Sequence, residues 1–98
     1  MIKQIDALII LNEDRTKILN RSAIRFHDIE KVLKNATKSW HLRDFFYDNK
    51  ADCNKTISWI EYYSKDKSIN IRRIKHCKEM LKEGFIFKKA TIVFNLDI

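Results

Sequence analysis

Histidine and cysteine are the residues of this chain best suited to bind a metal or act as a nucleophile, but their spacing fits neither role. The chain has three histidines and two cysteines, of which His76 and Cys77 are adjacent. Adjacent residues on a helix point about 100° apart, whereas zinc sites use paired spacings such as two cysteines separated by two residues. We therefore expect no metal and no cofactor. Cys77 also falls within an apolar helical pattern, where burial raises the pKa of a thiol and leaves it unreactive.

Paired carboxylates give no stronger sign of catalysis. Glu79 and Glu83 are one helical turn apart, but lysines share that stretch, which is typical of a solvated helix face. Asp44 and Asp48 form a second spaced pair that suits the end of a helix better than an active site. Gly84 is the single glycine, which excludes phosphate-binding loops and dinucleotide motifs because they need two or three glycines. We expect a protein that is not an enzyme.

Positive charge is the feature that indicates a partner. The chain has 20 basic and 13 acidic residues and a net charge of +7. Residues 65–89 hold nine lysines and arginines against three acidic residues, so this window carries +6 of that charge. Such clustering is typical of proteins that bind polyanions. We expect nucleic acid, either RNA or DNA, to be bound by Lys65, Lys67, Arg72, Arg73, Lys75, His76, Lys82, Lys88 and Lys89.

A helix over residues 69–83 would turn part of this cluster outward. Arg72 and Arg73 would contact phosphates or a guanine edge. Trp59 and Tyr62 are candidates for base stacking if they are exposed. The same helix also carries glutamates, which would repel a nucleic-acid backbone over its second half.

An acidic protein surface is the alternative partner. The basic face would bind it, or the aromatic patches at residues 40–47 and 59–63 would contact it, as in a phage-encoded inhibitor of a host nucleic-acid enzyme or defence system. Isoleucine, lysine and asparagine are abundant, and their A/T-rich codons favour an AT-rich source genome, as in many phages, low-GC bacteria and some archaeal viruses. A homodimer would help a chain of this size to bury surface. The short apolar run at residues 7–11 predicts neither a signal peptide nor a membrane segment, so we expect a cytoplasmic protein with free thiols.

The order of the expected elements, with strands at both ends and helices between them, predicts one α+β domain over residues 1–98. The apolar stretch at residues 5–11 predicts a buried strand, and residues 16–19 predict the returning strand of a hairpin whose turn contains no glycine. Residues 22–26 either continue the sheet or lead into a helix. The β-branched and aromatic segment at residues 85–96 predicts a strand that joins the N-terminal strand in the same sheet.

Two to four helices are expected between these strands. The first begins near Asp28, which suits an N-cap, and residues 40–46 either continue it or form a second short helix. Residues 47–52 are expected to form a loop. The next helix covers about residues 54–64.

The helix at residues 69–83 has the clearest pattern. Ser68 or Asn70 can cap its start, and Gly84 follows its end, where a left-handed C-cap residue is favoured. Its buried stripe is predicted to consist of Ile71, Ile74, Cys77 and Leu81. Together with residues 54–64, this helix also fits the spacing of a helix-turn-helix, although the glycine usual in the turn is missing.

Overall fold

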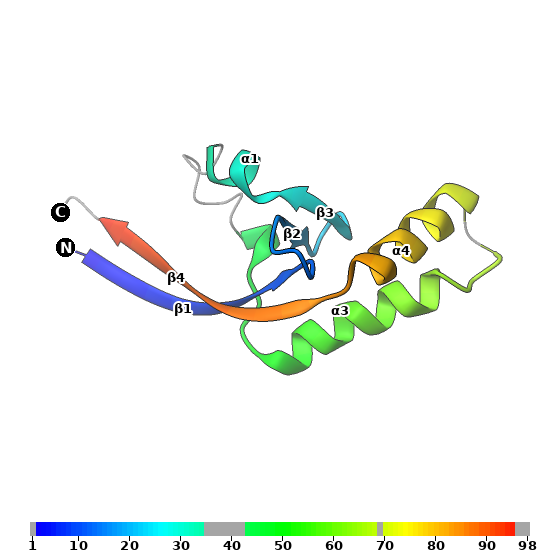
Figure 1. Cartoon of the computed structure of the whole chain (residues 1–98). Helices are drawn as coiled ribbons and strands as arrows, with labels where there is room; N and C mark the ends of the chain where they lie inside the picture. Colours follow the sequence, from blue (N-terminus) through cyan, green and yellow to red (C-terminus); the bar gives the residue numbers. More distant parts are fainter. Residues whose placement is uncertain (1, 35–42, 69, 96–98) are drawn as a thin grey trace.

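The computed structural model describes residues 2–34, 43–68 and 70–95, in which an antiparallel sheet is packed between helices (Figure 1). The strand order in this sheet is β3-β2-β1-β4. The elements in chain order are β1 (Ile2–Leu11), β2 (Lys17–Asn20), β3 (Arg25–Asp28), α1 (Ile29–Lys34), the 3₁₀ turn η1 (Arg43–Phe45), α3 (Lys50–Tyr63), α4 (Ile71–Glu83) and β4 (Ile86–Asn95). The predicted α+β domain, with an N-terminal hairpin and a C-terminal strand in the same sheet, is confirmed.

Consecutive residues at the end of β1 fill two different cores, because successive side chains of a strand point to opposite faces. Ile10 is fully buried with Ile60 of α3 and Met80 of α4. Leu11 is buried on the other face, where it packs with Phe45 of η1. The sheet is therefore covered on both faces, which explains why β1 ends in a continuous apolar run and not in an alternating pattern.

The pairing of β1 with β4 gives the molecule its elongated shape. The two strands pair along their whole length, from Ile2 opposite Asn95 to Leu11 opposite Ile86. β2 joins β1 at its end, where Leu11 lies opposite Ile18. The outer parts of β1 and β4 project from the body as a two-stranded ribbon (Figure 1), and the molecule measures 52 × 26 × 25 Å.

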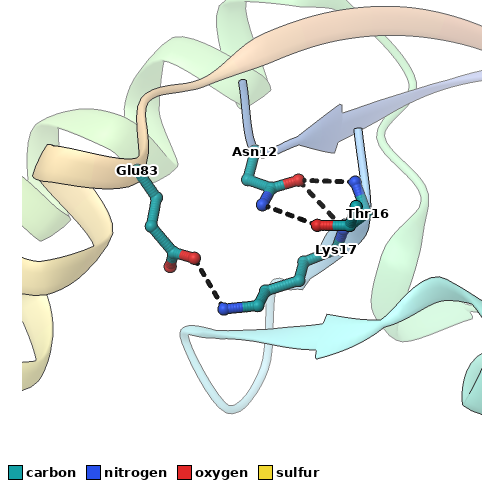
Figure 2. A network of polar contacts seen from close by, with 4 residues as sticks. All are labelled: Asn12, Thr16, Lys17 and Glu83. Atoms are coloured by element: carbon teal, nitrogen blue, oxygen red, sulfur yellow. Dashed lines mark hydrogen bonds and ion pairs between the residues drawn. The ribbon is translucent and has the colours of Figure 1, made fainter. Parts of the chain in front are cut away.

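A buried asparagine side chain builds the turn between β1 and β2, which contains no glycine, as predicted. The backbone N–H groups of Thr16 and Lys17 both donate to Oδ1 of Asn12 at 2.9 Å, and Nδ2 of Asn12 donates to Oγ1 of Thr16 at 3.1 Å (Figure 2). Asn12 is only 2% exposed. Lys17 also forms an ion pair with Glu83 at the end of α4, with 2.6 Å between Nζ and Oε1. This ion pair connects the β1–β2 turn to α4, which begins more than fifty residues later in the sequence.

The start of α3 differs from the prediction. Residues 47–52 were expected to form a loop, but α3 already begins at Lys50, because Oδ1 of Asn49 caps it by accepting from the N–H of Asp52 at 2.9 Å. Asp28 holds the start of α1 as predicted, since its Oδ1 accepts from the N–H of Glu30. Of the predicted segment 40–46, residues 40–42 lie outside the described residues.

The predicted buried stripe of α4 is wrong at its first position. Ile71 is 83% exposed, because it lies on the outer face of α4 with Lys75, Lys78 and Lys82 and about 120° around the helix from the buried Cys77. The buried residues of α4 are Cys77 and Met80, with Ile74 and Leu81 half-buried beside them. Gly84 follows the helix with φ 76° and ψ 169°. Its φ is positive, as predicted, but its ψ is extended and not that of a left-handed C-cap.

Candidate nucleic-acid interface

Three adjoining cavities form a groove across the β2–β3 turn, α3 and the start of α4. The first cavity, of about 440 Å³, lies between the β2–β3 turn and the first two turns of α4. Its described lining contains no carboxylate. It includes Arg25 from β3 and, from α4, Arg72, Arg73 and His76. Three arginines from two separate elements therefore belong to the lining of one cavity.

The other two cavities continue the groove along α3. The second, of about 360 Å³, shares Ile24 and Tyr63 with the first and is also lined by Arg21, Lys55 and Trp59. The third, of about 380 Å³, again has Lys55 and Trp59 in its wall and adds Ser58 and Tyr62. Among the described residues that line the three cavities, Asp52 is the only one with a carboxylate.

The β2–β3 turn is held in place by its own polar groups. Oδ1 of Asn20 accepts from the N–H groups of Ser22 and Ala23, both at 2.9 Å. Oγ of Ser22 donates to Oδ1 of Asp44 at 2.9 Å. Ile24 has a φ of 50°, which is rare for a β-branched residue and is a source of strain. This strained residue lies where the first two cavities meet.

Arg21 is positioned by contacts at the opposite end of this turn. Its N–H donates to the carbonyl of Asp44 at 2.7 Å, and its Nη1 donates to the carbonyl of Phe46 at 2.8 Å. The guanidinium carbon lies 4.6 Å from the ring centroid of Tyr47, at a distance typical of a cation–π contact. Burial raises the pKa of the Tyr47 phenol above its ordinary value. Arg21 is thus fixed at the edge of the groove, with further guanidinium donors left over.

The positive character of the groove at α4 comes from side chains and not from free helix amides. Asn70 caps the helix, since its Oδ1 accepts from the N–H of Arg72 at 2.8 Å. Its carbonyl accepts from the N–H groups of Arg73 and Ile74, at 3.0 and 3.2 Å. These amides already have partners, so an anion in the groove would be held by the guanidinium groups.

Aromatic rings from α3 stack beside these arginines. The guanidinium carbon of Arg73 lies 5.5 Å from the ring centroid of Tyr63. Tyr63 in turn stacks on Trp59, with 5.4 Å between centroids and 26° between planes. Trp59 is 47% exposed and Tyr62 is 59% exposed. Both candidates for base stacking are therefore open to solvent.

The structure divides the predicted basic cluster among different surfaces. Arg72, Arg73 and His76 line the groove. The other residues of the cluster are exposed elsewhere: Lys65 and Lys67 after α3, Lys75 and Lys82 along α4, and Lys88 and Lys89 on β4.

The lysines of α4 lie on its outer face. Lys75, Lys78 and Lys82 follow Ile71 at intervals of four, three and four residues, so they form one exposed stripe away from the buried Cys77. Glu83 was expected on this outer face, but it is paired with Lys17. Arg72, Arg73 and Lys75 are all exposed, but Lys75 lies on the outer face while Arg72 and Arg73 line the groove with the half-buried His76.

Three basic residues of the groove lining were not among the predicted binding residues: Arg21, Arg25 and Lys55. They lie before residue 65, in segments where acidic residues balance the charge along the chain. No signal in the sequence brings them to α4, because the positive-φ turn at Ile24 and the packing of α3 on α4 decide their position. The two helices are consecutive, as in a helix-turn-helix, but Arg72 and Arg73 lie in a concave site beside the sheet.

Cys77 and His76 line the first cavity, and both carry buried titratable atoms. Cys53 and Cys77 are free and almost fully buried, and burial raises the pKa of both thiols, so the prediction of free structural cysteines is confirmed. Nε2 of His76 is buried and has no hydrogen-bond partner among the described residues. Within residues 2–34, 43–68 and 70–95, no three side chains of histidine, cysteine, aspartate or glutamate gather as a metal site would require.

None of the described helices has the length and apolar character needed to cross a membrane. No protein-family model matches the chain, and no curated protein or solved structure is similar to it.

Proposed function

We propose that the protein binds RNA or DNA as a regulator, without catalysing a reaction on it, and that the groove holds the phosphate backbone. The observation that carries this proposal is that Arg25, Arg72 and Arg73 all belong to the lining of one cavity of about 440 Å³, whose described lining contains no carboxylate. Arginine is suited to this role because its planar guanidinium group donates two parallel hydrogen bonds to a phosphate.

Electrostatics also favour a polyanion in this cavity. Neighbouring cationic side chains repel one another, and no carboxylate from the described lining of that cavity relieves this repulsion. A phosphate bound between them would remove the repulsion and gain charge-assisted hydrogen bonds. Nucleic acid supplies such phosphates at regular intervals and releases counterions when they are neutralised. Binding should therefore weaken steeply as the salt concentration rises.

The test compares two double variants of α4 that change the net charge equally. In the first, Arg72→Glu and Arg73→Glu reverse the charge in the groove. In the second, Lys75→Glu and Lys82→Glu reverse it on the outer face of the same helix. Affinity is measured by fluorescence anisotropy with labelled oligonucleotides, single-stranded and duplex, over a series of salt concentrations beginning at about 50 mM.

We expect the groove variant to lose most of its affinity and the outer-face variant to keep most of it. For single strands, the loss of two phosphate contacts would lower the slope of log K against log salt concentration by about 1.4 in the groove variant. The groove variant should remain folded. The first turn of α4 contains no acidic residue, and glutamates introduced there interact favourably with the helix dipole, by about 0.3–1 kcal/mol each. Circular dichroism melting curves verify that both variants are folded.

Two results would count against the proposal. Equal weakening by the two variants would mean that binding depends on overall charge and not on the groove. If the unaltered protein binds no oligonucleotide at about 50 mM salt, the nucleic-acid proposal fails. The same guanidinium groups would then favour the carboxylates of an acidic protein surface as the partner.

A further inference from the structure

We infer that the groove takes a single-stranded segment, with an unpaired base stacked on the indole of Trp59; this inference rests on the proposed function and specifies its ligand. It begins from the position of Trp59. Tyr63 stacks against the indole, and Tyr62 meets it edge-on, with 6.4 Å between centroids and 85° between planes. The indole is nevertheless 47% exposed and borders two of the three cavities. The ring is thus held in a fixed orientation while much of it stays accessible.

Neighbouring rings make this indole a suitable stacking platform. A base gains most from an aromatic ring that does not have to be ordered on binding. Trp59 is already oriented by its contact with Tyr63, and Tyr63 is itself covered by the guanidinium group of Arg73. A base stacked on the indole would extend this existing column of planar groups.

Cationic groups lie on either side of this platform. Lys55 lines both cavities that Trp59 borders. Arg73 lies at the far end of the column, in the cavity with Arg25 and Arg72. A strand whose phosphates contact these groups would pass over the exposed part of the indole. Backbone contacts and base stacking are therefore available to the same segment of nucleic acid.

The concave shape of the site favours a single strand over a duplex. In a duplex the bases are stacked inside the helix, and the groove edges of the pairs are presented, not their faces. A base face becomes available to an aromatic side chain when the strand is unpaired, as in RNA loops and single-stranded segments. Cavities of about 360–440 Å³ are open to a nucleotide that is splayed out of its strand. The aromatic part of the groove would thus contribute to single-strand binding alone.

The test uses the fluorescence of Trp59 and its substitution. The chain has two tryptophans, so Trp40→Phe leaves Trp59 as the only indole. This variant is titrated with an unlabelled thymidine or uridine oligonucleotide of about 12 nucleotides, and with a blunt duplex of the same length. We expect the single strand to quench the indole and the duplex to leave it nearly unchanged. Affinities are then measured for Trp59→Ala, Trp59→Phe and, as a control outside the groove lining, Ile71→Ala.

The loss of one stacked base corresponds to a fall in single-strand affinity of about 5- to 150-fold for Trp59→Ala. Duplex affinity should stay within about twofold, and Trp59→Phe should recover much of the single-strand affinity because it keeps an aromatic face. Ile71→Ala should leave both affinities unchanged. The thermal midpoint of each variant shows whether it remains folded, and the phenylalanine variant keeps the test decisive if the alanine variant does not.

The possible outcomes separate this inference from the proposed function. If Trp59→Ala leaves single-strand affinity intact while the Arg72 and Arg73 reversal abolishes it, the stacking inference is wrong and the proposed function stands. If Trp59→Ala weakens duplex and single-strand binding equally, Trp59 supports the fold of the groove and does not contact a base, which also overturns the inference. If the unaltered protein binds neither probe, the proposed function itself fails.

Discussion

Replacement of Gly84 tests the backbone geometry that ends α4. Gly84 has φ 76° and ψ 169°, a region that is essentially restricted to glycine. A left-handed C-cap would have a ψ of about 47°, and asparagine tolerates that conformation well. The observed geometry therefore predicts that both Gly84→Ala and Gly84→Asn are destabilising, whereas a left-handed cap predicts that the asparagine variant is tolerated.

The size of the effect follows from three contributions. A non-glycine residue held in such a region costs about 1–3 kcal/mol, and the reduced freedom of the unfolded chain offsets about 0.4–1 kcal/mol of this. A Cβ at position 84 would also lie 3.2 Å from Oε2 and 3.3 Å from Cβ of Glu13, which is closer than ordinary van der Waals contact. We expect each variant to lose about 2 kcal/mol of unfolding free energy, equivalent to a fall in Tm of about 8–16 °C for a chain of this size.

Urea titration and thermal melting followed by circular dichroism measure both quantities. The combination of Gly84→Ala with Glu13→Ala removes the contact with the carboxylate and leaves the backbone strain together with the contact with Cβ of residue 13. We expect this double variant to recover less than half of the lost stability. The reasoning is refuted if Gly84→Asn stays within about 0.5 kcal/mol of the unaltered protein, or if Glu13→Ala restores the stability of Gly84→Ala in full.

Three further predictions concern stability and its dependence on pH. Met80→Ala should lower the unfolding free energy by about 2–5 kcal/mol, whereas Ile71→Ala should change it by less than about 0.5 kcal/mol. The reason is that Met80 is 1% exposed and Ile71 is 83% exposed. Equal losses of unfolding free energy in urea titrations would contradict this burial pattern. The hydrogen bond from Lys17 to Glu83 raises the pKa of Lys17 above its ordinary value of 10.5. The stabilisation of the fold by this pair is therefore complete below pH 10.5 and is lost as the pH rises through the raised pKa. Glu83→Gln should therefore lower Tm at neutral pH and make little difference at alkaline pH beyond that range, and an unchanged Tm at neutral pH would show that the pair does not stabilise the fold. Burial lowers the pKa of His27 below its ordinary value of 6.5, so the unfolded chain binds the proton more readily and the stability of the fold falls as the pH drops below 6.5. His27→Gln should make this fall in stability shallower in urea titrations at a series of pH values. A pH dependence equal to that of the unaltered protein would rule out His27 as its source.

Local patterns in the sequence were sufficient to predict the strands and most helix positions. The apolar run before Asn12 identified β1, and the β-branched segment after Gly84 identified β4. These signals are local, since they depend on side chains a few residues apart. The exposure of Ile71 was not predicted, because the predicted stripe was centred one position away from the face that α4 buries, which is the face of Cys77 and Met80.

The groove could be predicted only in part. Arg72 and Arg73 stood out because positive charge is dense around them, and the aromatic residues of α3 stood out by type. Arg21 and Arg25 belong to a segment of nearly balanced charge and reach the groove through the turn at Ile24, whose positive φ has no signature in an isoleucine. A turn made by glycine or asparagine would have been visible in the sequence.

The long pairing of β1 with β4 has a consequence for how the chain acquires its fold. β1 precedes every other described element and β4 follows them all, so their pairing closes a loop that contains the rest of the domain. Contacts between residues so distant in sequence form slowly, because the entropy of loop closure must be overcome first. During synthesis β1 leaves the ribosome with its backbone groups and apolar side chains unpaired and must wait for β4. Ile2 and Ile5 remain exposed even in the folded state, so the period before β4 arrives is when this protein is most prone to aggregate.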